Sequence, residues 1–253
     1  MVAKIENFPL ILLAGGRSSR MGRPKGLLDY RGHPWLLEQL RRFKAVSGKL
    51  AVVVLGYHHE LYFEKIPWLK KAGHKPTHQL GLKILAVVNP TPDYGQFSSI
   101  QCAIPFLQTK HLGSEEYLQG KKKVSAERRT TNDESIFSVA DLPGAFILPV
   151  DVPSPGKEVY EGLIQAFSKT IDAVVPQYQS KGGHPVLLSA GFLKRLAEVS
   201  PASPDARLDL QIRALPVERI ALVPVHDKNI CLNINSFDEF QDYAKREDES
   251  GRT

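Results

Sequence analysis

Residues 8–32 read FPLILLAGGRSSRMGRPKGLLDYRG. The first part, Phe8 to Ala14, is an apolar run with the length and bulk of a strand buried on both faces. Gly15 and Gly16 end this run and open a cationic loop, beyond which apolar residues at 35–43 recur at helical spacing. A strand, a glycine-rich cationic loop and a helix in this order are typical of α/β proteins that hold phosphate, because glycine leaves backbone N–H groups open to an anion.

Spacing excludes two common phosphate loops. The P-loop has two glycines separated by four residues and followed at once by Lys and Ser or Thr, and the dinucleotide loop has GxGxxG; the stretch contains neither. Residues 13–25, LAGGRSSRMGRPK, instead resemble the nucleotide-binding loop of the molybdenum-cofactor nucleotidyltransferases, whose pattern is LAGGxSxRMGxxK. Every fixed position of that pattern is filled. The alternative interpretation is an ordinary glycine-rich turn with surface cations.

The resemblance implies a role for each part of the loop. It assigns Lys25 to the α-phosphate of a nucleoside triphosphate and Arg20 to the β- and γ-phosphates. Two residues separate the RMG triplet from Lys25, as in the family's cytidylyltransferases, whereas its guanylyltransferases tend to have three. The loop spacing therefore favours CTP. The residues implied to cradle the nucleotide are Leu13, Ala14, Gly15, Gly16 and Gly22.

The rest of the chain alternates strand and helix patterns. We expect an α/β fold: a three-layer α/β/α sandwich with a Rossmann-like, mostly parallel sheet, of the nucleotide-diphospho-sugar transferase type. The active site is expected at the carboxyl ends of the strands that end near Ala14, Val88 and Val150. The predicted strands are 50–55, 82–88, 144–150 and 171–176, and the predicted helices lie at 60–72 and around 160–168.

We expect a single domain over residues 1–253, interrupted by a polar insertion at about 109–142. The insertion contains the run Lys121 to Lys123, and the family usually crosses this region in far fewer residues. Three interpretations compete: a lid over a charged substrate, a docking patch for a partner, and a solvated surface loop. The solvated loop is the default for such a composition.

Residues 89–100, NPTPDYGQFSSI, resemble the family's NPDYxxGxxSS segment, a turn that leads into a helix. The N-terminus of that helix faces the nucleotide in the family. We therefore expect Ser98 and Ser99 to cap the helix and to contact the nucleotide. A capping role alone is the alternative.

Asp151 follows directly on the predicted strand 144–150. Residues 150–153, VDVP, resemble the family's xDxP motif, whose Asp holds magnesium against the triphosphate. A hard cation prefers a carboxylate oxygen, and the ion neutralises phosphate charge as pyrophosphate departs. Asp-x-Pro is also a common helix start, but its place after a buried strand favours the metal role. Mg²⁺ is thus the predicted cofactor.

Residues 181–188, KGGHPVLL, resemble a GHPV segment typical of the molybdopterin branch of the family. The resemblance implies that Gly183 and His184 contact the pterin or its phosphate. The alternative is a turn with a structural histidine.

Near the C-terminus, residues 232–239 read LNINSFDE, in which Ser236 and Glu239 form a capping box. Cytidine-type relatives often carry Asp before the last helix, whereas Asn at 233 and 235 resembles the guanylyl branch. We expect Asn235 to add an amide oxygen to the magnesium site, with less charge than a carboxylate would supply. This departure leaves the nucleobase open between CTP and GTP.

Composition limits the kinds of partner that the chain is expected to bind. The 253 residues carry a formal charge of +6, which suits an anionic ligand, and 42% are hydrophobic, as in ordinary globular proteins. The two cysteines lack metal-type spacing, so we expect reduced thiols and a cytoplasmic location. No stretch has transmembrane length, and the cations lack the interleaved aromatic residues of nucleic-acid surfaces. Membrane and nucleic-acid partners are therefore not expected.

The predicted function is that of an enzyme, a magnesium-dependent nucleotidyltransferase. It would move CMP from CTP to the phosphate of molybdopterin, the molybdenum cofactor, and release pyrophosphate. Within enzymes, the alternatives are GTP-dependent guanylyl transfer and transfer to another small phosphate. A different class of alternative is a non-catalytic module that carries the cofactor to a molybdoenzyme or its chaperone. Magnesium-dependent release of pyrophosphate separates the two classes.

Overall fold

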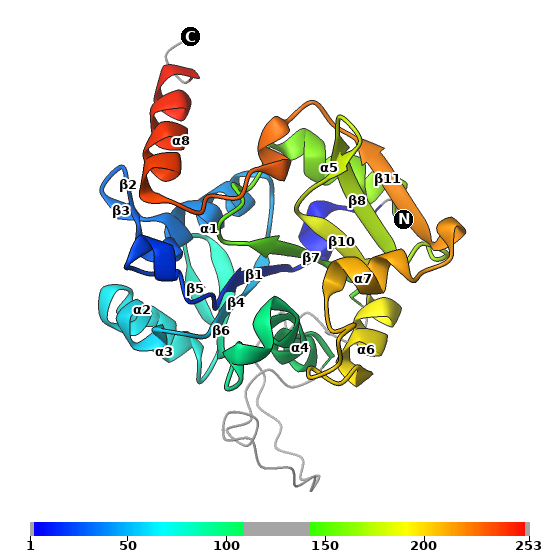
Figure 1. Ribbon diagram of the computed structural model, residues 1–253, viewed down its shortest axis with the longest axis horizontal. Coiled ribbons are helices and arrows are strands. Elements are labelled where there is room, and N and C mark those ends of the chain that lie inside the picture. Colours follow the sequence, from blue (N-terminus) through cyan, green and yellow to red (C-terminus); the bar gives the residue numbers. More distant parts are fainter. Residues whose placement is uncertain (1–2, 109–141, 251–253) are drawn as a thin grey trace, which may run out of the picture.

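The computed structural model describes residues 3–108 and 142–250 (Figure 1). The strands are β1 (Leu10–Ala14), β2 (Asp29–Tyr30), β3 (His33–Pro34), β4 (Leu50–Leu55), β5 (Thr77–Gln79), β6 (Leu82–Val88), β7 (Gly144–Pro149), β8 (Ala173–Tyr178), β9 (Lys181–Gly182), β10 (Val186–Ser189) and β11 (Ile220–Pro224). The helices are α1 (Trp35–Ala45), α2 (His59–Lys65), α3 (Pro67–Ala72), α4 (Gly95–Gln108), α5 (Lys157–Ala166), α6 (Ala190–Glu198), α7 (Leu208–Arg213) and α8 (Phe237–Ser250).

The main sheet has the strand order β11-β8-β10-β7-β1-β4-β6-β5, with β9 paired to β8, and β2 and β3 form a separate hairpin. β1 lies at its centre, parallel to β4 on one side and to β7 on the other. β6 continues the parallel part beyond β4, whereas β10 and β5 run antiparallel to their neighbours. The predicted mostly parallel sheet is confirmed.

Side chains of β1 alternate between two apolar layers, as the pleat of a strand requires. Leu10 and Leu12 join the layer formed with α1, α5 and α8, whereas Ile11 and Leu13 join the layer formed with α4 and α6. Helices accordingly cover both faces of the sheet (Figure 1). The expected three-layer sandwich is confirmed, and the continuous apolar run at 8–14 is explained because β1 is buried on both faces.

Three predicted elements differ in detail. The helix expected at 60–72 is divided into α2 and α3, because Pro67 forces the preceding Ile66 out of the helical region, to φ −132° and ψ 74°. The strand expected at 171–176 begins at Ala173, and the helix expected around 160–168 begins at Lys157. The insertion expected at 109–142 lies outside the described residues except for Leu142.

A buried aspartate joins four elements at the end of the sheet opposite to the carboxyl ends of β8 and β11. Asp172 is 3% exposed and accepts hydrogen bonds from Ser189 Oγ (2.9 Å) and Arg219 Nε (2.8 Å). It also forms an ion pair with Arg195. Burial alone would raise the pKa of Asp172, but the hydrogen bonds from these three residues hold that pKa below its ordinary value.

The lowered pKa makes the contribution of Asp172 to stability dependent on pH. A carboxyl group whose pKa is lower in the folded protein stabilises the fold above its ordinary pKa, 3.8, and loses this effect as the pH falls through the folded value. Asp172→Asn should therefore lower the free energy of unfolding at pH 7 by about 1–3 kcal/mol, and the gap to wild type should shrink below pH 3.8. Urea unfolding across this pH range measures the gap, and a gap independent of pH contradicts the argument.

Candidate active site

A cavity of about 510 Å³ opens at the carboxyl ends of β1 and β7, at the edge where the parallel strands of an α/β sheet present their loops. This volume falls within the range of small-molecule sites. Its wall contains these residues predicted from the sequence: Leu13, Ala14, Gly15, Gly16, Lys25, Ser99 and Asp151. The expected position of the site is thus matched by a cavity of suitable size.

The ammonium group of Lys25 joins two distant segments, of which Asp151 lines the cavity and Asn235 does not. Lys25 Nζ donates to Asp151 Oδ2 at 2.7 Å and to Asn235 Oδ1 at 2.9 Å. The side chains of Lys25 and Asp151 are only 15% and 24% exposed, so their ion pair is poorly screened by solvent. Three residues predicted to serve phosphate and metal therefore meet at one point, although they are 126 and 210 positions apart in the chain.

The backbone at Lys25 is held from two sides. Its N–H donates to Ser18 Oγ at 3.2 Å, and the next N–H, of Gly26, donates to the hydroxyl of Tyr62 at 3.2 Å. Tyr62 is buried, and burial raises the pKa of its hydroxyl, so the group remains protonated at neutral pH. Sequence reasoning missed Tyr62, because its distance from the loop depends on how α2 packs.

The turn that carries Asp151 is held by α1. Trp35 Nε1 donates to the carbonyl of Val150 at 2.7 Å, and Gln39 Nε2 donates to the carbonyl of Val152 at 2.6 Å. The amide oxygen of Gln39 in turn accepts from the N–H of Ser154 at 2.8 Å. Gln39 is fully buried, so each of these bonds satisfies a polar group that has no access to water.

Glycine is required at one close approach beneath the loop. A Cβ on Gly56, which follows β4, would lie 2.6 Å from the carbonyl oxygen of Gly15. The N–H of Tyr57 donates to that same oxygen at 3.3 Å. The loop that follows β1 is therefore packed at Gly15 directly on the end of β4, whereas a Cβ on Gly16 would meet no other atom within 4 Å.

A model of the MobA-like NTP transferase domain matches residues 10–214. The chain belongs to the MobA-like NTP transferase family. The family assigns it to the nucleotidyltransferases, in agreement with the resemblance of residues 13–25. The matched range includes Lys25 and Asp151, but Asn235 lies beyond its end.

This MobA-like NTP transferase also has named relatives. It is 50% identical over 50 residues to the molybdenum cofactor guanylyltransferase of Xanthomonas euvesicatoria pv. vesicatoria (strain 85-10), and this match covers 20% of the chain and 26% of the relative. In structure it is similar to Rv0371c of Mycobacterium tuberculosis H37Rv in complex with manganese (TM-score 0.59, 16% identity, covering 94% of this chain and 98% of that one). It is also similar to molybdopterin-guanine dinucleotide biosynthesis protein A of Archaeoglobus fulgidus (TM-score 0.60, 13% identity, 96% and 100%). The two structural likenesses establish the fold.

The cations of the loop are arranged differently from the sequence expectation. Arg20 is exposed and is not part of the cavity wall, whereas Arg17 lines the cavity. Arg17 forms an ion pair with Asp93, and its guanidinium lies 4.7 Å from the ring centre of Tyr57, whose hydroxyl also donates to Asp93. Hydrogen bonds from Tyr57 and Arg17 hold the pKa of Asp93 below its ordinary value. In this MobA-like chain, Arg17 is therefore the loop arginine on the cavity wall.

The expected serine cap is wrong. α4 begins at Gly95, so Ser98 and Ser99 lie within its first turns rather than at its cap. The buried side chain of Asn89 explains the difference, because its Nδ2 donates to Ser98 Oγ at 2.8 Å and to Ser99 Oγ at 3.1 Å. Ser98 also donates to the carbonyl of Gly95 at 2.8 Å. Ser99 lines the cavity, but Ser98 does not.

Gly183 and His184 lie outside the cavity wall and pack on the segment before α8. The N–H of His184 donates to the carbonyl of Ile230 at 2.9 Å, and a Cβ on Gly183 would lie 2.5 Å from the same oxygen. Burial lowers the pKa of His184, while the nearby charge of Asp151 acts in the opposite direction. These contacts explain why residue 183 is glycine, because two backbone segments approach each other closely there. Gly22, the last predicted loop residue, also lies outside the cavity wall and adopts a left-handed φ of 64°.

The donor atoms at Lys25 suit a hard divalent cation. Asp151 offers a carboxylate oxygen and Asn235 an amide oxygen, both of the oxygen type that Mg²⁺ prefers. Within residues 3–108 and 142–250, no cluster of three or more His, Cys, Asp or Glu side chains could hold a metal ion. A site with so few protein ligands fits Mg²⁺, which usually takes its other ligands from substrate phosphates and water.

Among the described residues, no helix combines the length and the apolar character that a membrane-spanning segment requires.

Proposed function

We propose that this chain transfers a nucleotidyl group from a nucleoside triphosphate to the phosphate of molybdopterin and releases pyrophosphate. The observation that supports this most strongly is the meeting of Asn235 with Lys25 and Asp151, two residues of the cavity wall that also contains Gly15 and Gly16. Membership in the MobA-like family supports nucleotidyl transfer, and the names of two relatives support a molybdenum-cofactor acceptor. A molybdoenzyme or its chaperone is the partner that would receive the product.

The reaction that we propose needs positioned charge more than acid–base chemistry. An oxygen of the acceptor phosphate attacks the α-phosphorus of the nucleotide, the new P–O bond forms, and the bond to pyrophosphate breaks. The acceptor oxygen already carries negative charge, so no base must remove a proton. The main demand is to bring two anions together in line. Lys25 reaches the cavity wall with its ammonium group and would neutralise the α-phosphate, while the backbone at Gly15 and Gly16 would hold the phosphate chain.

Asp151 and Asn235 are the residues that would hold a divalent cation. When bound, the ion would neutralise charge on the phosphates as pyrophosphate leaves. Mg²⁺ is the cation we propose, and the manganese complex of the structurally similar Rv0371c is compatible with a divalent-metal site in this fold. Trp35 and Gln39 would keep the Asp151 turn in place as the charges change, because they hold the carbonyls on either side of it.

We favour GTP as the donor, with CTP as the second candidate. The Xanthomonas relative is named a guanylyltransferase, and Asn at 233 and 235 resembles the guanylyl branch. The spacing of two residues between the RMG triplet and Lys25 favours CTP instead. The two observations concern different segments, so a direct comparison of the nucleotides is needed.

A thermal-shift titration with GTP, CTP and ATP, each with and without Mg²⁺, makes this comparison. A nucleotide at a hundred times its dissociation constant should stabilise the fold by about 2.7 kcal/mol, and the shift should depend on the metal. We expect the largest shift with GTP, and a larger shift with CTP would reverse the order of the two candidates. Absence of any nucleotide-dependent shift contradicts nucleotide binding by the free protein. Binding of a nucleotide without metal-dependent release of pyrophosphate in the presence of molybdopterin supports the non-catalytic alternative.

A further inference from the structure

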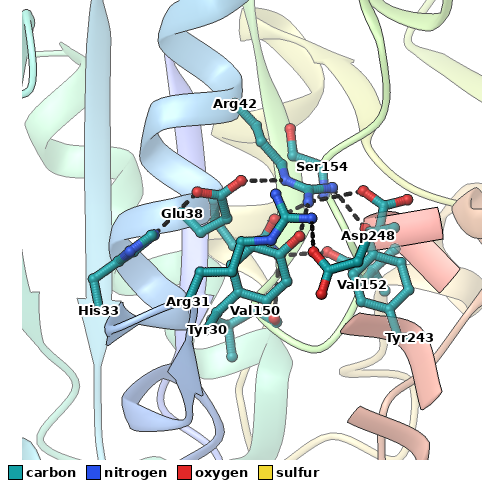
Figure 2. Close-up of polar contacts among 12 residues, drawn as sticks. Tyr30, Arg31, His33, Glu38, Arg42, Val150, Val152, Ser154, Tyr243 and Asp248 are labelled. Carbon is teal, nitrogen blue, oxygen red and sulfur yellow. Dashed lines mark hydrogen bonds and ion pairs between the residues drawn. The ribbon is translucent and has the colours of Figure 1, made fainter. Parts of the chain in front are cut away.

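A partly buried arginine outside the cavity donates hydrogen bonds to three parts of the chain. Figure 2 shows Arg42 of α1 between Glu38 of the same helix and Tyr243 of α8. Its guanidinium donates to Glu38 Oε1 at 2.9 Å, to Tyr30 Oη of the β2–β3 hairpin at 3.1 Å, to Tyr243 Oη at 2.6 Å and to Glu247 Oε2 at 3.0 Å. Burial would lower the pKa of Arg42, but these partners raise it above its ordinary value, so the group is always charged. We call these five residues the Arg42 cluster.

Arg42 shares one face of α1 with the residues that hold the Asp151 turn. Trp35, Gln39 and Arg42 are spaced by four and three residues, which puts their side chains on the same side of a helix. The first two bind the carbonyls of Val150 and Val152. A single helix face thus contacts both the turn of Asp151 and α8.

The segment just before α8 supplies the second oxygen that accepts a hydrogen bond from Lys25. Asn235 comes two residues before α8, and its N–H donates to Glu239 Oε2 at 2.6 Å. The expected capping box is confirmed, because Ser236 N donates to Glu239 Oε2 and Glu239 N donates to Ser236 Oγ, both at 3.2 Å. The N–H of Ile234 also donates to the carbonyl of Asp151 at 2.9 Å. Asn235 is therefore tied on one side to the Asp151 turn and on the other to the first turn of α8.

We propose that Arg42 is a positioning residue that sets the place of Asn235 relative to Asp151 by anchoring α8 to α1. Arg42 supplies the polar contacts of this anchor through Tyr243 and Glu247, while the rings of Phe240 and Tyr243 pack against Trp35 with centroids 5.6 and 5.7 Å away. This role rests on the proposed function, because it concerns the two residues, Asp151 and Asn235, that would hold the metal ion. It concerns a segment beyond residues 10–214, the range that the family model matches.

A purely structural role for Arg42 makes a different prediction. If the cluster only stabilises the fold, its loss lowers the melting temperature but leaves the affinity for a divalent cation unchanged in protein that remains folded. If Arg42 positions Asn235, the affinity for the cation falls as well, while nucleotide affinity without metal changes little, because the glycine loop and the cavity wall are untouched. Partners of metal ligands typically contribute 10- to 100-fold in metal affinity when they are removed.

The experiment measures Mn²⁺ binding by electron paramagnetic resonance in the presence of saturating GTP, or of CTP if that nucleotide binds better. Arg42→Met keeps most of the side-chain stem and removes the hydrogen bonds, and it should raise the dissociation constant of Mn²⁺ about tenfold. Arg42→Lys keeps the charge and should fall between Arg42→Met and wild type. Arg41→Met is the matched control, because Arg41 is exposed on the same helix, and it should change the constant less than twofold.

A second variant protects the test against misfolding. Tyr243→Phe combined with Glu247→Met removes the α8 hydrogen-bond acceptors of Arg42 and leaves Glu38 to pair with it. This protein should fold and should bind Mn²⁺ several-fold more weakly. An unchanged Mn²⁺ constant in this folded double variant overturns the positioning role, even where Arg42→Met does not fold. If wild type itself fails to bind Mn²⁺ with any nucleotide, the proposed function fails, and this result is distinct from a failure of the variants alone.

Discussion

Replacement of Lys25 by alanine should lower the turnover of nucleotidyl transfer by about a hundredfold or more, as the loss of one positioned electrostatic group usually does. The Lys25 ammonium lies at the cavity wall and is held by Asp151 and Asn235, so its position is defined before the chemical step. Steady-state release of pyrophosphate measures the effect. Nucleotide affinity should fall much less than turnover, because the backbone of the loop is unchanged.

Two variants control for charge and for general damage. Lys25→Arg keeps the positive charge but not the compact ammonium that fits between Asp151 and Asn235, so it should recover only part of the lost turnover. Lys70→Ala removes an exposed lysine of α3 and should leave turnover unchanged. Near-normal turnover of Lys25→Ala would remove Lys25 from the mechanism.

Asp151→Asn should reduce turnover at a fixed Mg²⁺ concentration by about a hundredfold to a thousandfold. The amide keeps the shape of the carboxylate, but it removes the negative charge, so Lys25 is left with only amide oxygens, at positions 151 and 235, as acceptors. The Mg²⁺ concentration that gives half-maximal turnover should be higher in the variant than in wild type. Since both amide and carboxylate accept a hydrogen bond, the variant should remain folded, which its melting curve would show.

Asp209→Asn provides the comparison, because Asp209 is a carboxylate of α7 that pairs with Arg207 at the surface. Its metal dependence should match that of wild type. If Asp151→Asn has an unchanged metal dependence, the carboxylate is not a ligand of the cation, and the resemblance of residues 150–153 to a metal motif has no functional meaning here.

The main features of the fold and the meeting of Lys25 with Asp151 could be predicted from local patterns. Each residue follows a continuous apolar run, and such runs become parallel strands whose carboxyl ends share one edge of a sheet. β1 and β7 are in fact neighbours, with Leu12 paired to Leu148. The capping box of Ser236 and Glu239 could also be predicted from the sequence, because it depends only on two residues three positions apart.

The remaining details depend on tertiary packing, which local patterns do not encode. Arg17 and Arg20 are both loop cations in the sequence, and only the approach of Asp93 and Tyr57 brings Arg17 to the cavity. Asn89 likewise turns the serine hydroxyls inward. Gln39 is a polar residue in an apolar helix pattern, and this exception was the available signal, since a polar side chain on a buried face needs a partner.

The bonds from α1 to the Asp151 turn divide the site into two parts with different local stability. Gln39 and Trp35 are core residues, so the turn can separate from α1 only when buried hydrogen bonds and packing are broken together. Gly16 and Arg17 are exposed and lie on a short loop, where opening has a low free-energy cost. Amide hydrogen exchange should therefore be slow at Ser154 and fast along residues 16–20. A nucleotide would then enter by adjustment of the loop against the rigid Asp151 turn.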